Sequence, residues 1–151
     1  MAVPRSQYVV TMEQRLSIIT LAVSDLAASR AFYRDVFGWN EIEPRADEIA
    51  FFQLSGLQFA LYPAAAMAAE HNGLVAAPQG FTLAYNVNSR DDVDEVYAHV
   101  TGRGATSLKE PEEVFWGGYS CYVAGPDGEQ WEIAYNPFTA VNEDGTYGAW
   151  R

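Results

Sequence analysis

The hydrophobic pattern of the first half of the chain predicts one strand, one helix and three more strands. The apolar run from Leu16 to Val23 is strand-like, and Ser24-Asp25 then offers a helix N-cap. The apolar positions that follow have helical spacing as far as Gly38, which ends the predicted helix. The three strands expected next are Trp39 to Glu43, Ile49 to Leu54 and Leu57 to Tyr62.

The same order of elements begins again in the second half. Phe81 to Asn88 alternates apolar and polar residues, and Ser89 opens a sequence that resembles a capping box. Four apolar residues between Val93 and Val100 recur at helical spacing, which predicts a helix with one face against a sheet. The further strands are expected near Thr106 to Glu110, Tyr119 to Ala124 and Gln130 to Tyr135. The two halves therefore read as two copies of one βαβββ unit.

The length of the chain favours a single domain. With 151 residues, of which 49% are hydrophobic, one core is expected. We place the first module at about 15–63, a linker at 64–79, the second module at about 80–137 and a C-terminal tail at 138–151. The Ala-rich linker is interpreted either as a plain surface connection or as a lid over a pocket. Tyr147 and Trp150 suggest that the tail packs on the body or on a partner.

Charge and cysteine content exclude several classes of function. The chain carries 20 acidic and 9 basic residues, a net charge of −11, which repels nucleic acid and anionic membranes alike. One cysteine and two histidines exclude a Cys/His zinc finger, and Cys121 is expected in the core. Residues 1–14 match neither a secretory signal nor a membrane anchor, so we expect a cytoplasmic protein.

Three short motifs resemble those of the vicinal oxygen chelate superfamily, which includes glyoxalase I, bleomycin-resistance proteins and extradiol dioxygenases. They are Val23-Ser24-Asp25-Leu26 with Phe32-Tyr33, then Phe37-Gly38-Trp39, and then Gly125 to Ile133, within a likeness that covers Arg15 to Pro137. The resemblance implies an α+β fold in which two tandem βαβββ modules form a curved mixed sheet around a small-molecule cavity. It does not fix the chemistry, since the superfamily contains isomerases, lyases, dioxygenases and binding proteins.

The resemblance also indicates where a metal would bind. In metal-dependent members each half supplies one ligand from its first strand and one from its last. Carried onto this sequence, the four positions are Ile18, Thr82, Glu132 and Phe59, or Ala60 if the register differs by one residue. Only Glu132 can bind a divalent metal strongly, so we expect no metal and no other cofactor. His71 in the linker and His99 on the second helix are expected at the surface.

Glu132 is the candidate catalytic residue. A carboxylate on an inward face must find hydrogen-bond donors, gain a raised pKa or stay hydrated, so Glu132 is either a base or acceptor for a ligand or is satisfied by its neighbours. The polar side chains expected to line the cavity are Thr82, Asn86 and Gln130. The aromatic residues that would stack on a ligand, or else form core packing, are Phe59, Trp116, Tyr119 and Tyr122.

Three functions fit this sequence, and we favour the first. It is a metal-free small-molecule-binding protein, similar to the bleomycin-resistance branch, with an acidic groove for a cationic or aromatic compound. The second is a metal-dependent lyase, isomerase or dioxygenase of the glyoxalase type, whose other ligands lie elsewhere. The third is a metal-free enzyme that uses Glu132 for proton transfer. A homodimer is expected in each case, because pairing would bury open sheet edges.

Overall fold

The computed structural model describes residues 14, 16–45, 47–70 and 82–148, and these form two βαβββ modules. The elements of the first module are β1 (Ile18–Val23), α1 (Leu26–Asp35), β2 (Glu41–Arg45), β3 (Ile49–Gln53) and β4 (Gln58–Pro63). The short helix α2 (Ala64–Glu70) follows. The second module contains β5 (Leu83–Val87), α3 (Arg90–Thr101), β6 (Thr106–Glu113), β7 (Tyr119–Ala124) and β8 (Gln130–Tyr135). The predicted repeat is confirmed.

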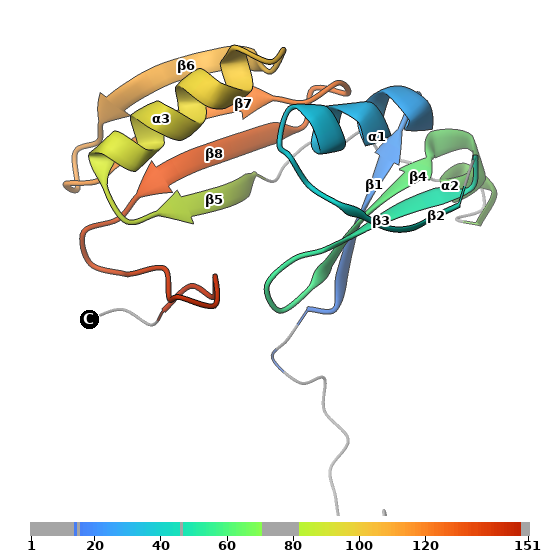
Figure 1. Cartoon of the computed structure of the whole chain (residues 1–151), viewed down its shortest axis with the longest axis horizontal. Coiled ribbons are helices and arrows are strands. Elements are labelled where there is room, and N and C mark those ends of the chain that lie inside the picture. The colour runs from blue at the N-terminus through green and yellow to red at the C-terminus, as the bar shows by residue number, and fades with distance from the viewer. Residues whose placement is uncertain (1–13, 15, 46, 71–81, 149–151) are drawn as a thin grey trace, which may run out of the picture.

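Each module has its own four-stranded sheet. The strand orders are β1-β4-β3-β2 and β5-β8-β7-β6, with one parallel pair, β1–β4 or β5–β8, in each sheet. The described strands thus form two four-stranded mixed sheets, one in each module, which confirms the expected fold of tandem βαβββ modules. Helix α1 packs over β3 and β4, and α3 packs over β6, β7 and β8 (Figure 1). Each sheet therefore has a covered face under its helix and an open face on the other side.

Local signals place both long helices. The Asp25 carboxylate accepts a hydrogen bond of 3.0 Å from the backbone N–H of Ala28, and the Ser89 hydroxyl accepts one of 3.0 Å from that of Asp92. After α1, Gly38 has φ +75°, a conformation that a side chain would strain. The predicted cap residues are confirmed.

Six of the eight strands differ from their predicted bounds by one to three residues, and β2 and β6 are examples. Strand β2 begins at Glu41 instead of Trp39, because the Trp39 ring turns into the aromatic core. Strand β6 continues through Pro111 to Glu113, although the prediction stopped at Glu110. Proline is tolerated there because β6 is the edge strand of its sheet.

The covered faces of both sheets share one hydrophobic core. Its large buried residues include Tyr33, Phe52 and Phe59 of the first module, and Cys121 is buried with them as expected. Trp131 of β8 joins the two halves, since its ring centroid lies 5.2 Å from that of Phe37. The modules are thus held together by aromatic packing on their helix sides.

The tail crosses back from the second module to the first. Asn88 exchanges two hydrogen bonds with the backbone of Val141, and the Ser55 hydroxyl donates one of 2.9 Å to the carbonyl of Asp144 (Figure 1). The hydroxyl of Tyr147 accepts a hydrogen bond from Asn86. The tail therefore packs on the body as far as residue 148, whereas Trp150 and most of the expected linker lie outside the described residues.

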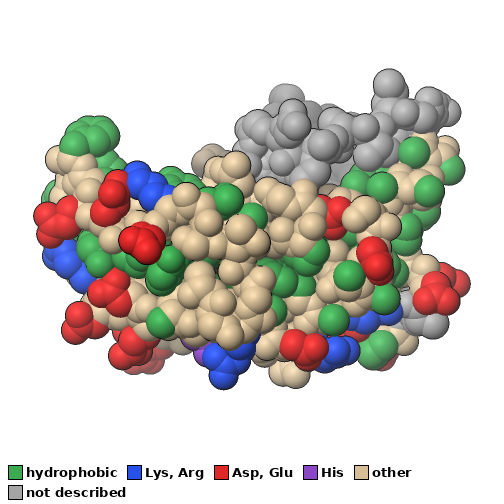
Figure 2. Space-filling model, turned by 90° about the horizontal axis from the view of Figure 1, so that it is seen from above, with side chains coloured by type: hydrophobic (Ala, Val, Ile, Leu, Met, Phe, Trp, Pro, Cys, Tyr) green, Lys and Arg blue, Asp and Glu red, His purple; other side chains and the backbone are tan. Residues whose placement is uncertain are grey.

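On the face drawn in Figure 2, the acidic side chains of the described residues are spread out and do not form one patch. On the face drawn in Figure 2 they lie over both modules, and the middle of this face is mostly polar or hydrophobic. Within the described part of the chain, none of the helices has the length and apolar character that crossing a membrane requires.

Candidate functional site

Glu132 lies on the open face of the second sheet. In β8, Trp131 and Ile133 are buried toward the covered face, so alternation directs Glu132 to the other side. Its cross-strand neighbour in β7 is Tyr122, whose hydroxyl lies close enough to the Glu132 carboxylate to affect its acidity. This half-buried pair is the strongest candidate on the open face for contact with a ligand.

The surroundings change the acidity of both groups. Burial raises the pKa of the Glu132 carboxyl above its usual range, and the neighbouring Tyr122 hydroxyl offsets part of this rise. Burial also raises the pKa of the Tyr122 hydroxyl, and the negative charge of Glu132 adds to that effect. Tyr122 therefore stays protonated at neutral pH, while Glu132 holds a proton at higher pH than an ordinary glutamate.

Polar residues expected near Glu132 share its face. Gln130 precedes it by two residues in β8 and is exposed, and Asn86 lies on the same side of β5, where it donates a hydrogen bond of 3.2 Å to the Tyr147 hydroxyl. Thr82 is exposed and lies just before β5, four residues before Asn86, so strand alternation places it on the same face. The open face thus carries one carboxylate, one phenol and several amide or hydroxyl groups.

The aromatic residues expected to line the cavity lie elsewhere, except Tyr122. Phe59 is 1% exposed, because the register of β1 and β4 turns it into the core and leaves Ala60 on the open face. Tyr119 points to the covered face, where its hydroxyl donates a 2.8 Å hydrogen bond to Asp94 of α3. Trp116 lies in the loop before β7, 39% exposed, with its ring over Gly118.

A buried carboxylate that was not singled out from the sequence lies where the modules meet. Glu129 is 1% exposed and accepts a hydrogen bond of 2.8 Å from the Tyr33 hydroxyl, which accepts one of 3.1 Å from the Trp131 indole. Asp127 in the same turn accepts hydrogen bonds from the backbone of Ser24 and the hydroxyl of Ser29. The sequence does show an acidic residue, Glu129, directly before the buried strand β8. Its partner Tyr33 lies 96 residues away in the chain, so the sequence does not indicate the contact.

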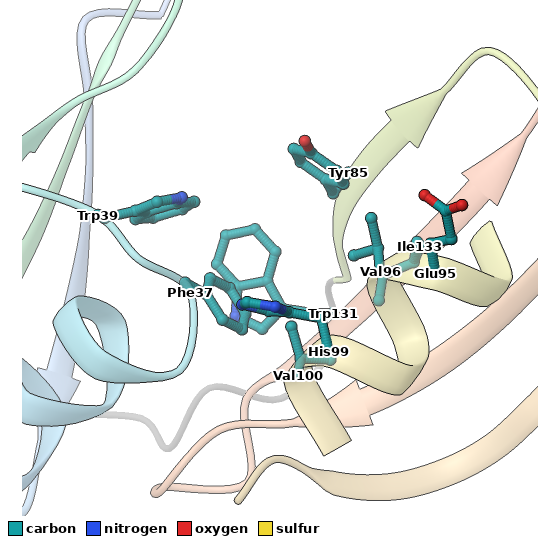
Figure 3. A pocket seen from close by; sticks show the side chains of 9 residues that line it. All are labelled: Phe37, Trp39, Tyr85, Glu95, Val96, His99, Val100, Trp131 and Ile133. Atoms are coloured by element: carbon teal, nitrogen blue, oxygen red, sulfur yellow. The ribbon is translucent and has the colours of Figure 1, made fainter. Parts of the chain in front are cut away.

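The described residues line at least three hollows. A pocket of about 370 Å³ lies between the modules, beside α3 (Figure 3). A groove of about 910 Å³ lies between the β3–β4 hairpin, β5 and the tail, and it shares Trp39, Tyr85 and Trp131 with the pocket. A third hollow of about 620 Å³ lies on the open face of the first sheet, over Thr20 and Phe51. Glu132 lines none of these three.

The residues at the four positions expected for a metal do not fit a metal centre of the usual type. Ile18 and Ala60 offer only hydrocarbon, Thr82 offers a hydroxyl, and Glu132 is the single strong ligand. Among the described residues, no three side chains of His, Cys, Asp or Glu are grouped closely enough to hold an ion. A lone carboxylate beside a phenol suits hydrogen bonding and proton transfer better than metal coordination.

Comparison with known proteins places this geometry in a family. Residues 15–133 match the model of the Glyoxalase/Bleomycin resistance protein/Dioxygenase superfamily. A glyoxalase-related enzyme from Fulvimarina pelagi is 32% identical, with a TM-score of 0.85 over 92% of this chain and 100% of that one. A glyoxalase/bleomycin resistance protein/dioxygenase from Nocardioides is 26% identical, with a TM-score of 0.71 over 84% of this chain and 86% of that one.

A more distant structure shares the fold alone. Lactoylglutathione lyase from Agrobacterium tumefaciens is 20% identical, with a TM-score of 0.63 over 84% of this chain and 97% of that one. The match to the family model covers most of the chain, and the 32% identity extends over nearly all of it. This chain therefore belongs to the glyoxalase/bleomycin resistance protein/dioxygenase superfamily, the group that its sequence motifs resemble.

Proposed function

We propose that this protein binds a small organic molecule on the open face of its second sheet and needs no metal ion to do so. The observation that carries the proposal is the pair formed by Glu132 and Tyr122, a half-buried carboxylate with one phenol beside it on the neighbouring strand. The other three positions of the expected ligand set supply Ile18, Ala60 and Thr82, which bind metals weakly or not at all.

The pair offers a defined mode of recognition. An ionised Glu132 accepts hydrogen bonds from a ligand amine or hydroxyl, and the flat ring of Tyr122 lies beside it for an aromatic ligand. Because burial makes the ionised carboxylate costly, a cationic or hydrogen-bond-donating ligand gains more here than at an exposed glutamate. We therefore expect cationic or aromatic ligands.

A thermal-shift screen of aromatic and cationic compounds tests the proposal. A ligand that binds only the folded state raises the melting temperature in a saturable way. The shift should shrink in Glu132→Gln and Tyr122→Phe, whereas Glu110→Gln, which removes an equal charge from the exposed edge strand β6, should leave it unchanged. If no compound stabilises the protein, or if all three variants respond like the wild type, the proposal is wrong.

A second candidate is a metal-free enzyme in which Glu132 transfers a proton. Its raised pKa supports this role, because a general base works best when its pKa approaches the working pH. Such an enzyme would turn over a ligand found in the screen. Glu132→Gln would abolish this turnover, whereas the Tyr122→Phe variant would still bind the ligand with measurable affinity. If a ligand is bound but never converted, the enzyme candidate is wrong and only the binding function remains.

Elemental analysis separates these two candidates from a metal-dependent lyase, isomerase or dioxygenase. We expect protein purified without chelator to contain less than one equivalent of nickel, zinc, manganese and iron taken together. A stoichiometric metal that is lost in Glu132→Gln would overturn the metal-free proposal. Retention of the metal in that variant would place the metal at another site. Glu132 would then still have its proposed role in ligand binding or proton transfer.

We also propose that the protein is a cytoplasmic homodimer. Among the described strands, β1 and β5 each pair with one neighbour only, so each leaves a backbone edge open. Ile18 on β1 is 44% exposed, which gives the edge of the first sheet apolar surface to bury. Light scattering after gel filtration should give twice the mass of the chain, and Ile18→Glu should shift the mass toward the monomer.

A further inference from the structure

The pocket between the modules is separate from the open face that carries Glu132. It lies on the covered side of β8, between the loop that follows α1 and the side of α3 (Figure 3). Trp131 and Ile133 line it, whereas Glu132 between them points away. A ligand in this pocket would therefore not touch the proposed site.

Aromatic rings form much of the wall of this pocket. The centroids of Phe37, Trp39 and Trp131 lie 5.2 to 5.6 Å apart, so the three rings pack into one rigid group. Tyr85 projects from β5 above this group and is 48% exposed (Figure 3). The faces of such rings carry partial negative charge and attract cations, tryptophan most strongly.

The charge of the lining has one sign. Glu95 on α3 is an exposed carboxylate at the pocket, His99 lies one helical turn further along, and neither Lys nor Arg is among the described lining residues. The net charge of −11 also raises the local concentration of cations around the protein. An anionic ligand would meet Glu95 and the ring faces, so the pocket discriminates against it.

We propose that this pocket is a second ligand site, which takes a small organic cation of the alkylammonium or quaternary ammonium class. The charged head group of such a cation contacts the faces of the Tyr85 and Trp131 rings, and the Glu95 carboxylate adds negative charge at the α3 side of the pocket (Figure 3). The volume of about 370 Å³ is near the lower end for ligand pockets and suits a compound of the size of choline. The proposal does not depend on the function assigned to Glu132.

Calorimetric titration with choline and with 3,3-dimethylbutan-1-ol tests the charge requirement. The alcohol has nearly the same shape as choline but carries no charge, so it measures apolar contact alone. We expect choline to bind saturably and the alcohol to bind roughly tenfold more weakly, which corresponds to the energy of a partly desolvated cation–π contact. Absence of choline binding, or equal affinity for both compounds, would overturn the proposal.

Variants locate the site. Glu95→Gln and Tyr85→Ala change exposed side chains, so the fold is retained, and each should weaken choline binding several-fold. Glu110→Gln on β6 removes the same charge outside the pocket and should have no effect. Glu132→Gln should also leave the choline affinity unchanged. If Glu132→Gln weakened binding and Glu95→Gln did not, the cation would occupy the open face and this second site would be refuted.

Discussion

Tyr33 of α1 donates a 2.8 Å hydrogen bond to Glu129, a carboxylate buried 96 positions later in the chain. The other carboxylate oxygen of Glu129 accepts a hydrogen bond of 2.9 Å from the backbone N–H of Asp127. Burial, followed by the charge of Glu129, raises the pKa of the Tyr33 hydroxyl, so it remains a donor at all ordinary pH values. This contact ties the helix of the first module to the last turn of the second.

Tyr33→Phe should lower the free energy of unfolding by about 1 to 3 kcal/mol, because Glu129 would lose a donor and remain buried. Urea unfolding measures this change. Tyr97→Phe is the matched control, since the Tyr97 hydroxyl makes a 2.8 Å hydrogen bond at an exposed site and its loss should cost about 0.5 kcal/mol or less. Equal costs for the two variants would show that burial of the Tyr33–Glu129 contact contributes nothing.

Gly125→Ala should destabilise the protein because its new methyl group would overlap the Glu129 side chain. We expect a loss of about 1 to 3 kcal/mol, as for other overpacked sites. The same change in a Glu129→Ala background should cost less, since the overlapping atoms are gone. A double-mutant cycle by urea unfolding gives the coupling, and strictly additive costs would contradict the steric explanation.

Glu132 should make the stability depend on pH. Its folded pKa is raised, so between the ordinary glutamate value of about 4.3 and the raised value the folded protein holds a proton that the unfolded chain releases. The free energy of unfolding therefore falls as pH rises through this interval. Glu132→Gln should flatten that decline and gain more stability at neutral than at acidic pH. A gain that is the same at both pH values would contradict the raised pKa.

Cys121 should be unreactive in the folded protein. Its side chain is fully buried, and burial raises the pKa of the thiol to about 11, so little thiolate exists at pH values where ordinary cysteines react. Ellman's reagent should detect one thiol per chain in urea and almost none without it. Fast reaction of the native protein would show that the core around Cys121 opens readily.

Local features of the chain could be predicted because their causes are local. Asp25 and Ser89 cap the helices that follow them, and β7 and β8 lie within the residues given by their apolar runs. The prediction for β6 ended too early, because the sequence does not say that Pro111 would lie on an edge strand. Strand alternation also places Glu132 on the face of β8 opposite to that of the buried Trp131 and Ile133, as its candidate role required.

Contacts between distant segments were the part that the sequence left open. Whether Phe59 or Ala60 faces a ligand depends on the pairing of β4 with β1, and a shift of one residue exchanges the two faces. Tyr119 was expected beside a ligand, but its hydroxyl bonds to Asp94 of α3.

The sequence by itself determined two βαβββ modules and a single strong metal ligand, Glu132, at the positions taken from the family. Only the tertiary structure decided that Glu129 is buried against Tyr33 and that Trp39 and Tyr85 meet across a pocket between the modules. The physical reason is the distance along the chain over which each interaction acts. Periodicity and capping act over a few residues, whereas a buried carboxylate or a shared pocket depends on how two folded modules pack against each other.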